Sequence, residues 1–471
     1  MHITLGIDIG TSSVRVAALV TGAWTVLEGT VSSVLSDVQR KSDGTETIAT
    51  ETFIDSIVTA IDGCLKRLPA GAVIDAIGTS CFWHSIIAVD TLGTAQSPIL
   101  LWSDRRSAST LDDLRKEDPG LPDTTGCPWH TSFAIAKIEW WKRNKIGNAT
   151  RWLSPTEYLE AELFVDAGGP STSMASASGC FDQARQRWLP QYEDDLQPVS
   201  DTVCQVLKPQ YQVRWPKLIG VPWVPGIGDG AAANLGTGCW KHGNITLTVG
   251  TSVALRRCVE GDMPSRPGGL WRYQLGRGYW LLGGASSNGG SVWQWCLDTF
   301  KFDVNALNHL RNEPSRVVVL PYYSGERAPW WQDHITASIS GLTAGTRPEE
   351  IVLAHLEAIA VHTSWIAASL DVTDQSILYA SGNALQQSSL LAQCLADACN
   401  CSLILQDSGE QSLIGAARWA MHTVCGISLT PNAPSLVSTS ITSTSEGITR
   451  MKGISDAMKL HLHQHIRLSP S

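Results

Sequence analysis

Two short segments of the 471-residue chain resemble each other although they lie far apart. IDIGTSSV near the start and LTVGTSVA near the middle each read as a strand, a Gly-Thr-Ser turn and a second strand, and 240 positions separate Gly10 from Gly250. Alternating and β-branched residues favour strands at Leu5–Ile9 and Val14–Val20. A repeat this distant cannot be the period of a solenoid. It predicts a duplicated domain, in which each half opens with a hairpin.

The rest of the chain alternates between helix-like and strand-like stretches. Helical periodicity predicts helices at Thr47–Leu68 and Ala134–Asn144 and a long amphipathic helix at Glu349–Leu370. This alternation indicates an α/β fold, and the chain is too long for one hydrophobic core. We expect an N-terminal domain at 1–243, a C-terminal domain at 244–430 and a final segment at 431–471. That segment begins with a Ser/Thr-rich linker or ordered surface loop and ends in a helix.

Composition and charge argue against several classes of protein. The net charge of −9 argues against a nucleic-acid partner, although backbone amides and one metal ion can still hold phosphate. No basic region precedes the first apolar run and no stretch of 18 apolar residues occurs, so we expect neither a signal peptide nor a membrane span. The 12 Cys form no CxxC pair and are interpreted as reduced, mostly buried thiols of a cytoplasmic protein. A homodimer is left open.

The two turns are candidate phosphate sites. Consecutive backbone amides and hydroxyls in such a turn form a concave set of donors that suits phosphate oxygens. Asp8 precedes the first turn, where a carboxylate can hold Mg²⁺ through water, and Arg15 adds positive charge. The alternative is a tight hairpin that needs glycine for its backbone, with Asp8 only hydrogen-bonded. Two similar turns in two domains favour the phosphate interpretation; the turn residues are Gly10, Thr11, Ser12, Ser13, Gly250, Thr251 and Ser252.

A glycine-rich segment between the two hairpins contains Asp229. Gly226, Gly228 and Gly230 surround it, and the small residues after it predict the start of a helix. Glycines let a ligand approach the backbone, and a helix N-terminus favours phosphate. A carboxylate here could accept the proton of a hydroxyl that attacks a γ-phosphoryl group. The alternative is a glycine-rich turn with a hydrogen-bonded Asp.

These segments together resemble the FGGY carbohydrate kinases, members of the actin–hexokinase–Hsp70 superfamily, over nearly the whole chain. GIDIGTSSVR and GIGDGAAANLGTG resemble the two phosphate motifs of the family, SGNALQQS resembles its adenine motif, and GAARWA resembles its final helix. YYSGERAPWW matches a stretch typical of the second domain. The resemblance implies an α/β fold with two ribonuclease-H-like (actin/hexokinase/Hsp70-type) domains that flank a cleft.

The resemblance also assigns roles by position. It implies that Asp229 is the catalytic base, that Asp8 and Asp229 anchor Mg²⁺, and that ATP is the co-substrate. Asn383 stands where a second glycine is usual in the adenine motif. The implied ATP contacts are Gly10, Thr11, Ser12, Ser13, Arg15, Gly250, Thr251, Ser252, Gly290, Gln294, Gly382, Asn383 and Gln387.

The implied sugar contacts lie in the first domain. CFWHSIIAVD places His84 at a substrate-facing position, with Trp83 where a Met is usual, and LWSDRRS supplies further contacts including Trp102. TGCPWHTSFAIAKIEWW, with His130 and Lys137, resembles the gluconate kinases more than the xylulose or glycerol kinases. The expected substrate contacts are Trp83, His84, Asp104, Arg105, His130 and Asp229.

The resemblance therefore implies an ATP-dependent kinase of a small sugar or sugar acid, with D-gluconate converted to 6-phosphogluconate as the leading interpretation. A xylulose kinase, or a kinase of another ketose or polyol, is the alternative within the class. A catalytically silent relative that binds sugar or nucleotide is the rival outside it. The candidate base Asp229, Asp8 and both turns argue against that rival.

Overall fold

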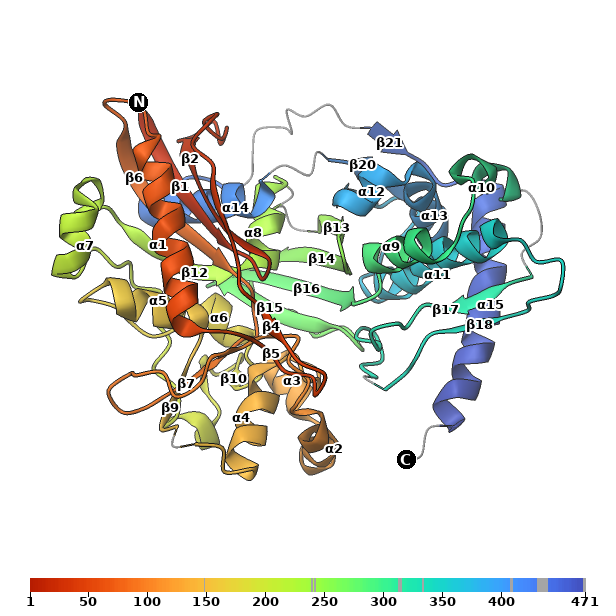
Figure 1. The fold of residues 1–471 in the computed structure, drawn as a ribbon, viewed down its shortest axis with the longest axis horizontal. Helices are drawn as coiled ribbons and strands as arrows, with labels where there is room; N and C mark the ends of the chain where they lie inside the picture. The colour runs from red at the N-terminus through yellow and green to blue at the C-terminus, as the bar shows by residue number, and fades with distance from the viewer. Residues whose placement is uncertain are drawn as a thin grey trace.

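The computed structural model describes residues 1–147, 149–238, 240, 243–311, 316–332, 334–406, 410–429 and 439–468. Two large sheets dominate it (Figure 1). The strands of the first sheet are β1 (His2–Ile9), β2 (Ser13–Val20), β3 (Ser32–Leu35), β6 (Val73–Cys81) and β12 (Trp223–Gly228). The strands of the second sheet are β13 (Ile245–Val249), β14 (Val253–Glu260), β15 (Trp271–Gly276), β16 (Tyr279–Ser286), β19 (Ile377–Ser381), β20 (Ser402–Leu405) and β21 (Thr439–Ile441).

The two sheets share one topology. The first runs β3-β2-β1-β6-β12, and the second contains the equivalent order β16-β14-β13-β19-β20, with β15 and β21 added at its edges. In both, the first two pairings are antiparallel and the next two are parallel. This is the ribonuclease-H-like arrangement, and it confirms the duplication that the two Gly-Thr-Ser hairpins predict.

Shorter elements complete the fold. The helices are α1 (Thr50–Lys66), α2 (Ala108–Glu117), α3 (Leu121–Thr125), α4 (Ala134–Arg143), α5 (Pro155–Leu163), α6 (Thr172–Ser176), α7 (Pro209–Arg214), α8 (Asp229–Gly236), α9 (Gly290–Thr299), α10 (Val304–Leu310), α11 (Pro348–Ser369), α12 (Asn383–Gln387), α13 (Ser389–Cys399), α14 (Gln411–Cys425) and α15 (Ser445–Leu468), with 3₁₀ turns at Pro190–Tyr192 and Pro216–Leu218. The remaining strands are β4 (Gln39–Arg40), β5 (Glu46–Ile48), β7 (Ile87–Val89), β8 (Ile99–Leu100), β9 (Arg151–Leu153), β10 (Phe181–Asp182), β11 (Arg187–Trp188), β17 (Val318–Leu320) and β18 (Ser338–Ser340).

Helices cover both faces of the first sheet. Alternate residues of β1, such as Leu5 and Ile7, join a buried cluster with Ile57 of α1. The opposite face packs against α8 and α14. The approach of α14 requires glycine, because a Cβ on Gly78 would lie 2.0 Å from the carbonyl oxygen of Ala416. A helix that follows β20 of the second sheet in sequence thus closes the first sheet and ties the two halves together.

The long helix α11 differs from its prediction. The helix itself is confirmed, but its expected amphipathic pattern is wrong, because every residue from Val352 to Thr363 is buried. By length and composition α11 could cross a membrane, yet 78% of its most apolar window is buried inside the protein. A central helix of a globular core meets the same criterion, so this is weak evidence for a membrane span.

The C-terminal segment is attached to the second half. Part of the expected linker, 431–438, lies outside the described residues, and residues 439–468 contain β21 and α15. Arg450 of α15 forms a buried ion pair with Glu357, 2.5 Å apart, and Met451, Met458 and Leu462 are buried. The domain limits at 243/244 and 430/431 remain predictions.

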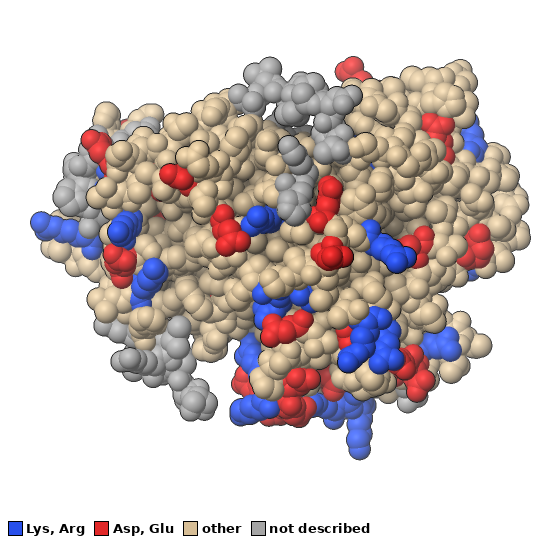
Figure 2. All heavy atoms as spheres, turned by 180° about the vertical axis from the view of Figure 1, so that it is seen from behind, with Lys and Arg blue, Asp and Glu red and all other residues tan. Residues whose placement is uncertain are grey.

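The described cysteines and the surface agree with the composition. Ten of these cysteines are free and buried, and Cys425 is free and exposed. Basic and acidic side chains are interspersed on the face drawn in Figure 2.

Candidate active site

Each of the two predicted phosphate turns is closed by a hydrogen bond from the amide of its first glycine. The Gly10 amide donates to the carbonyl oxygen of Ser13 (2.9 Å), and the Gly250 amide donates to that of Ser252 (3.0 Å). Within the described part of the chain, the amide that follows each of these glycines donates to no other group. Each turn can therefore offer at least one amide to a phosphate oxygen.

Asp8 is the centre of a charged network beside the first turn. Its carboxylate is 4% exposed and accepts hydrogen bonds from the Ser80 hydroxyl (2.7 Å) and the Arg15 guanidinium (2.5 Å). The other side of Arg15 lies 2.6 Å from Glu410, the residue that caps α14. Arg15 thus joins the first hairpin to a helix from the second half of the chain.

Asp229 is the first residue of α8 and directly follows β12. One of its oxygens accepts a hydrogen bond from the Gly230 amide (2.7 Å). Burial raises the pKa of Asp229 to about 6, while nearby Arg256 lowers it and nearby Asp8 raises it further. Such a carboxylate is ionised at neutral pH and is a stronger proton acceptor than an exposed Asp, as a general base requires.

An aromatic wall stands beside Asp229. Trp83 packs against the backbone on either side of it, since a Cβ on Gly228 would lie 1.7 Å from the Trp83 ring. The Trp83 ring meets Tyr273 edge-on at 5.0 Å, and Tyr273 stacks on Trp271 at 4.2 Å. Aromatic faces of this kind can stack on the C–H groups of a sugar.

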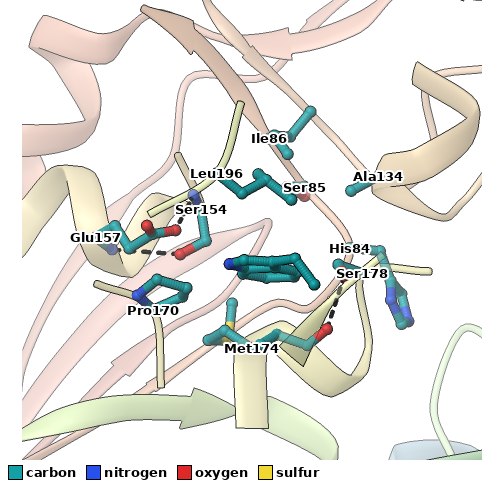
Figure 3. Close-up of a pocket in the computed structure, with 12 residues that line it drawn as sticks. His84, Ser85, Ile86, Ala134, Ser154, Glu157, Pro170, Met174, Ser178 and Leu196 are labelled. Carbon is teal, nitrogen blue, oxygen red and sulfur yellow. Dashed lines mark hydrogen bonds between the residues drawn. The ribbon is translucent and has the colours of Figure 1, made fainter. Parts of the chain in front are cut away.

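His84 is held as a neutral imidazole. Burial lowers its pKa to about 3, so Nδ1 carries the proton and donates to the carbonyl oxygen of Ala177 (2.7 Å). Nε2 is then an acceptor and lies 3.5 Å from the Tyr273 hydroxyl. Behind His84 is a cavity of about 20 Å³, also lined by Glu157 and Trp188, with room for roughly one water molecule (Figure 3).

His130 and Lys137 are both buried near His84. His130 Nδ1 accepts a hydrogen bond from the Ser132 amide (3.1 Å). The Lys137 ammonium, 1% exposed, donates to the carbonyl oxygens of Thr131 and Ser132 (2.7 and 2.8 Å). Lys137 therefore lies in the interior of the protein and not on a solvated face of α4.

Two charged residues of the LWSDRRS segment, Asp104 and Arg105, already form hydrogen bonds within the protein. Asp104 is 2% exposed and its carboxylate is engaged with the Arg106 side chain and with the Glu46 amide. Arg105 is exposed and donates to the carbonyl oxygen of Ser324 (2.9 Å). Sugar contacts from Asp104 and Arg105 remain predictions, and neither side chain is free in this structure.

The predicted nucleotide residues separate into a tight glycine cluster and an exposed set. A Cβ on Gly290 would lie 2.4 Å from the carbonyl oxygen of Gly250. A Cβ on Gly382, whose φ is +116°, would lie 2.3 Å from that of Val249. These glycines bring the starts of α9 and α12 against the second turn. Gln294, Asn383 and Gln387 are exposed on these helices, and their contacts with ATP remain predictions.

Three residues near the site have no role in the sequence interpretation: Arg256, Arg327 and Tyr273. Arg256 lies on β14 beside Gly230 and donates to the Thr248 hydroxyl (3.2 Å). Arg327 is 9% exposed and lies over the Trp102 ring at 5.4 Å. Arg327 belongs to the YYSGERAPWW motif, so that motif was the available signal. Arg256 and Tyr273 lie on strands of the second sheet, and nothing local marks them.

The acidic residues fit Mg²⁺ bound together with a nucleotide. Among the described residues, no group of three or more His, Cys, Asp or Glu could hold a metal by itself. Mg²⁺ in nucleotide sites commonly takes one or two carboxylates together with phosphates and water. Asp8 and Asp229, which are close enough for Asp8 to raise the pKa of Asp229, meet that requirement.

Comparison with known proteins agrees with this geometry. The chain matches the models of the FGGY family of carbohydrate kinases, the N-terminal domain over residues 3–236 and the C-terminal domain over residues 245–424. A gluconokinase from Bacillus subtilis (strain 168) is 26% identical over 447 residues, which span 88% of this chain and 86% of the relative.

Two solved structures from Lactobacillus acidophilus share the fold. A gluconate kinase has a TM-score of 0.89 at 20% identity, with 99% of this chain and 100% of that chain covered. A ligand-bound xylulose kinase also has a TM-score of 0.89, at 19% identity, with 100% and 99% covered.

Two ribonuclease-H-like sheets joined by α14, with a Gly-Thr-Ser turn in each, and the matches to both family models place the chain in the class of two-domain sugar phosphotransferases. The chain belongs to the FGGY family of carbohydrate kinases. Kinases of this family use ATP, typically with Mg²⁺.

Proposed function

We propose that the enzyme transfers the γ-phosphoryl group of ATP to D-gluconate, giving 6-phosphogluconate and ADP. The observation that carries the proposal is a group of cations around the candidate base. Arg256 and Arg327 both act on the pKa of Asp229, and Arg327 and Lys137 act on that of His84. A partly desolvated site with this many cations favours an anionic acceptor, because a buried carboxylate needs charged donors.

Arg256 and Arg327 are the strongest candidates to meet the acceptor carboxylate. Burial lowers the pKa of Arg256; nearby Asp229 raises it and the nearby charge of Arg327 lowers it, so Asp229 offsets part of the repulsion between the two guanidinium groups. A substrate carboxylate would relieve that repulsion. Arg105 ranks lower because an exposed cation contributes little. Lys137 already donates to two backbone carbonyls.

Asp229 supports the transfer step as base. Its carboxylate accepts the proton of the acceptor hydroxyl as that oxygen attacks the γ-phosphorus; the bond to the β,γ-bridging oxygen breaks and ADP leaves. Mg²⁺ held through Asp8 and Asp229 would neutralise phosphate charge. The amides of the two turns would hold the phosphates, and the exposed Asn383 and Gln387 would contact adenine.

Xylulose is the second candidate acceptor. The xylulose kinase and the gluconate kinase of Lactobacillus acidophilus resemble this chain equally in fold, each with a TM-score of 0.89. The aromatic wall beside Asp229 would serve a neutral sugar as well. The raised pKa of the candidate base Asp229, together with the two predicted phosphate turns, argues against a catalytically silent relative.

A coupled assay of ADP release tests the proposal. Purified enzyme with ATP and Mg²⁺ is given aldonates, ketoses and polyols, and kcat/KM is measured for each. We expect the largest value with gluconate. A larger value with xylulose would overturn the gluconate assignment and leave the family assignment intact.

A further inference from the structure

The strand that delivers Asp229 is irregular. The pairing of β12 with β6 shifts register between Val224 and Ile227, so two residues of β12, Pro225 and Gly226, stand opposite one residue of β6. A bulge of this kind interrupts the ladder of backbone hydrogen bonds and redirects the strand. Asp229 comes shortly after, so the shape of the bulge determines where its carboxylate lies.

Side chains from α5 and α6 take over the bonds that the bulge interrupts. The Gly226 amide donates to Glu160 (3.1 Å), and the Ser171 hydroxyl donates to the Gly226 carbonyl oxygen (2.6 Å). Two residues on, the Gly228 amide donates to the Ser173 hydroxyl (3.1 Å). Glu160, Ser171 and Ser173 are 3%, 4% and 0% exposed. Glu160 is the ionisable member of this set.

The packing around the bulge leaves no space for a different backbone conformation at Gly226. A Cβ on Gly226 would lie 2.4 Å from the Thr156 side chain of α5, and Pro225 has no amide hydrogen to donate. The Gly226 amide is buried, so losing the Glu160 oxygen would leave it without a partner. The bulge would then have to move, and Asp229 would move with it.

We propose that Glu160 is a positioning residue for Asp229, which it holds in place through the backbone of Gly226. The proposal rests on Asp229 being the catalytic base. Burial raises the pKa of Glu160 to about 8, so its carboxyl is largely neutral at pH 7 and needs no counter-ion. A neutral carboxyl keeps one oxygen as the acceptor for the Gly226 amide.

Glu157 provides a matched control on the same helix. It is 4% exposed, and burial raises its pKa to about 7. Its carboxylate turns back to the Ser154 amide (2.6 Å) at the start of α5 and lines the cavity drawn in Figure 3. Glu157 also acts on the pKa of Glu160, but its hydrogen bond goes to Ser154, so substituting Glu157 removes a buried acid and keeps the bond between Glu160 and Gly226.

The experiment compares Glu160→Leu, Glu160→Gln, Glu160→Asp and Glu157→Leu with wild type, using whichever of gluconate and xylulose wild type prefers. We expect Glu160→Leu to lower kcat by about 10- to 100-fold, because a misplacement near 1 Å is costly for a catalytic group. The Kd values for ATP and sugar should change by less than about threefold. Glu160→Gln keeps the acceptor and should stay within about threefold of wild-type kcat.

Glu157→Leu should lower the unfolding midpoint as much as Glu160→Leu while leaving kcat within about threefold. Equal kcat losses in these two variants, or an unchanged kcat in Glu160→Leu, would overturn the proposal. Should Glu160→Leu not fold, Glu160→Asp decides: its carboxyl is one methylene too short, so wild-type turnover there would overturn the proposal. Asp229→Asn, assayed alongside, separates the two claims: if it is active, the base assignment itself fails.

Discussion

The two hairpins share a fold but not a chemistry. In the first, the second residue pair from the turn is Asp8 opposite Arg15, and in the second it is Thr248 opposite Ala254. At this pair the first hairpin therefore carries an acid and a base, whereas the second carries two neutral residues and lies beside the glycines at the starts of α9 and α12. The duplicated fold supplies two Gly-Thr-Ser turns, and in the proposed function the acidic residues of the first half would carry proton transfer and metal binding.

The largest effect should come from charge in the first hairpin. Asp8→Asn should lower kcat by about 10²-fold or more and raise the Mg²⁺ concentration required, since a lost metal carboxylate removes several kcal/mol of transition-state stabilisation. Thr248→Val at the equivalent position loses one hydrogen bond, which corresponds to about fivefold at most. Steady-state kinetics across a Mg²⁺ titration measure both. Equal losses of kcat in Asp8→Asn and Thr248→Val would contradict the claim that the two hairpins differ in chemistry.

An intermediate effect should distinguish the cations of the site. Arg256→Met should lower the ratio of kcat/KM for gluconate to that for xylulose by about tenfold or more, roughly 1.4 kcal/mol. Arg105→Met, at another of the expected substrate contacts, should change the ratio by less than about threefold because Arg105 is exposed. The reverse result would place the carboxylate near Arg105. Equal loss for both sugars in Arg256→Met would assign Arg256 to phosphate.

A smaller effect should appear in stability. Burial raises the pKa of Asp229 from 3.8 to about 6, so above pH 6 the folded protein holds a charge that it disfavours. Two pKa units correspond to at most about 3 kcal/mol, and partial solvent exposure reduces this to roughly 1 kcal/mol. Asp229→Asn should therefore be more stable than wild type at pH 7.5. Below pH 3.8 the Asp229 carboxyl is protonated in both the folded and the unfolded state, so the variant's gain in free energy of unfolding should fade between pH 6 and pH 4. Urea unfolding at pH 7.5 and 4.5 measures it, and a gain that persists at pH 4.5 would exclude this cause.

The sequence predicts the local parts of the site well. The hairpin turns depend on Gly, Thr and Ser in adjacent positions, so the sequence alone predicts both the duplication and the two turns. Asp229 can be identified as a candidate site residue from the sequence because its glycine neighbours lie next to it in the chain. Its assignment as base remains a prediction.

Long-range contacts account for what the sequence does not predict. Asp104 is engaged with Arg106, Arg256 reaches the site from a strand of the second sheet, and Glu160 meets Gly226 across 66 positions. The burial of α11 on all sides also depends on neighbours distant in sequence, so its periodicity is a poor guide. Composition and spacing do not encode these pairings.

The most direct test of the account is the turnover of Asp229→Asn. The substitution keeps the size and most hydrogen bonds of the side chain but removes its ability to accept the acceptor proton. We expect kcat to fall by about 10²–10⁴-fold, while ATP binding, measured by calorimetry, is retained. A variant that binds ATP and turns over near the wild-type rate would contradict the assignment of Asp229 as the base.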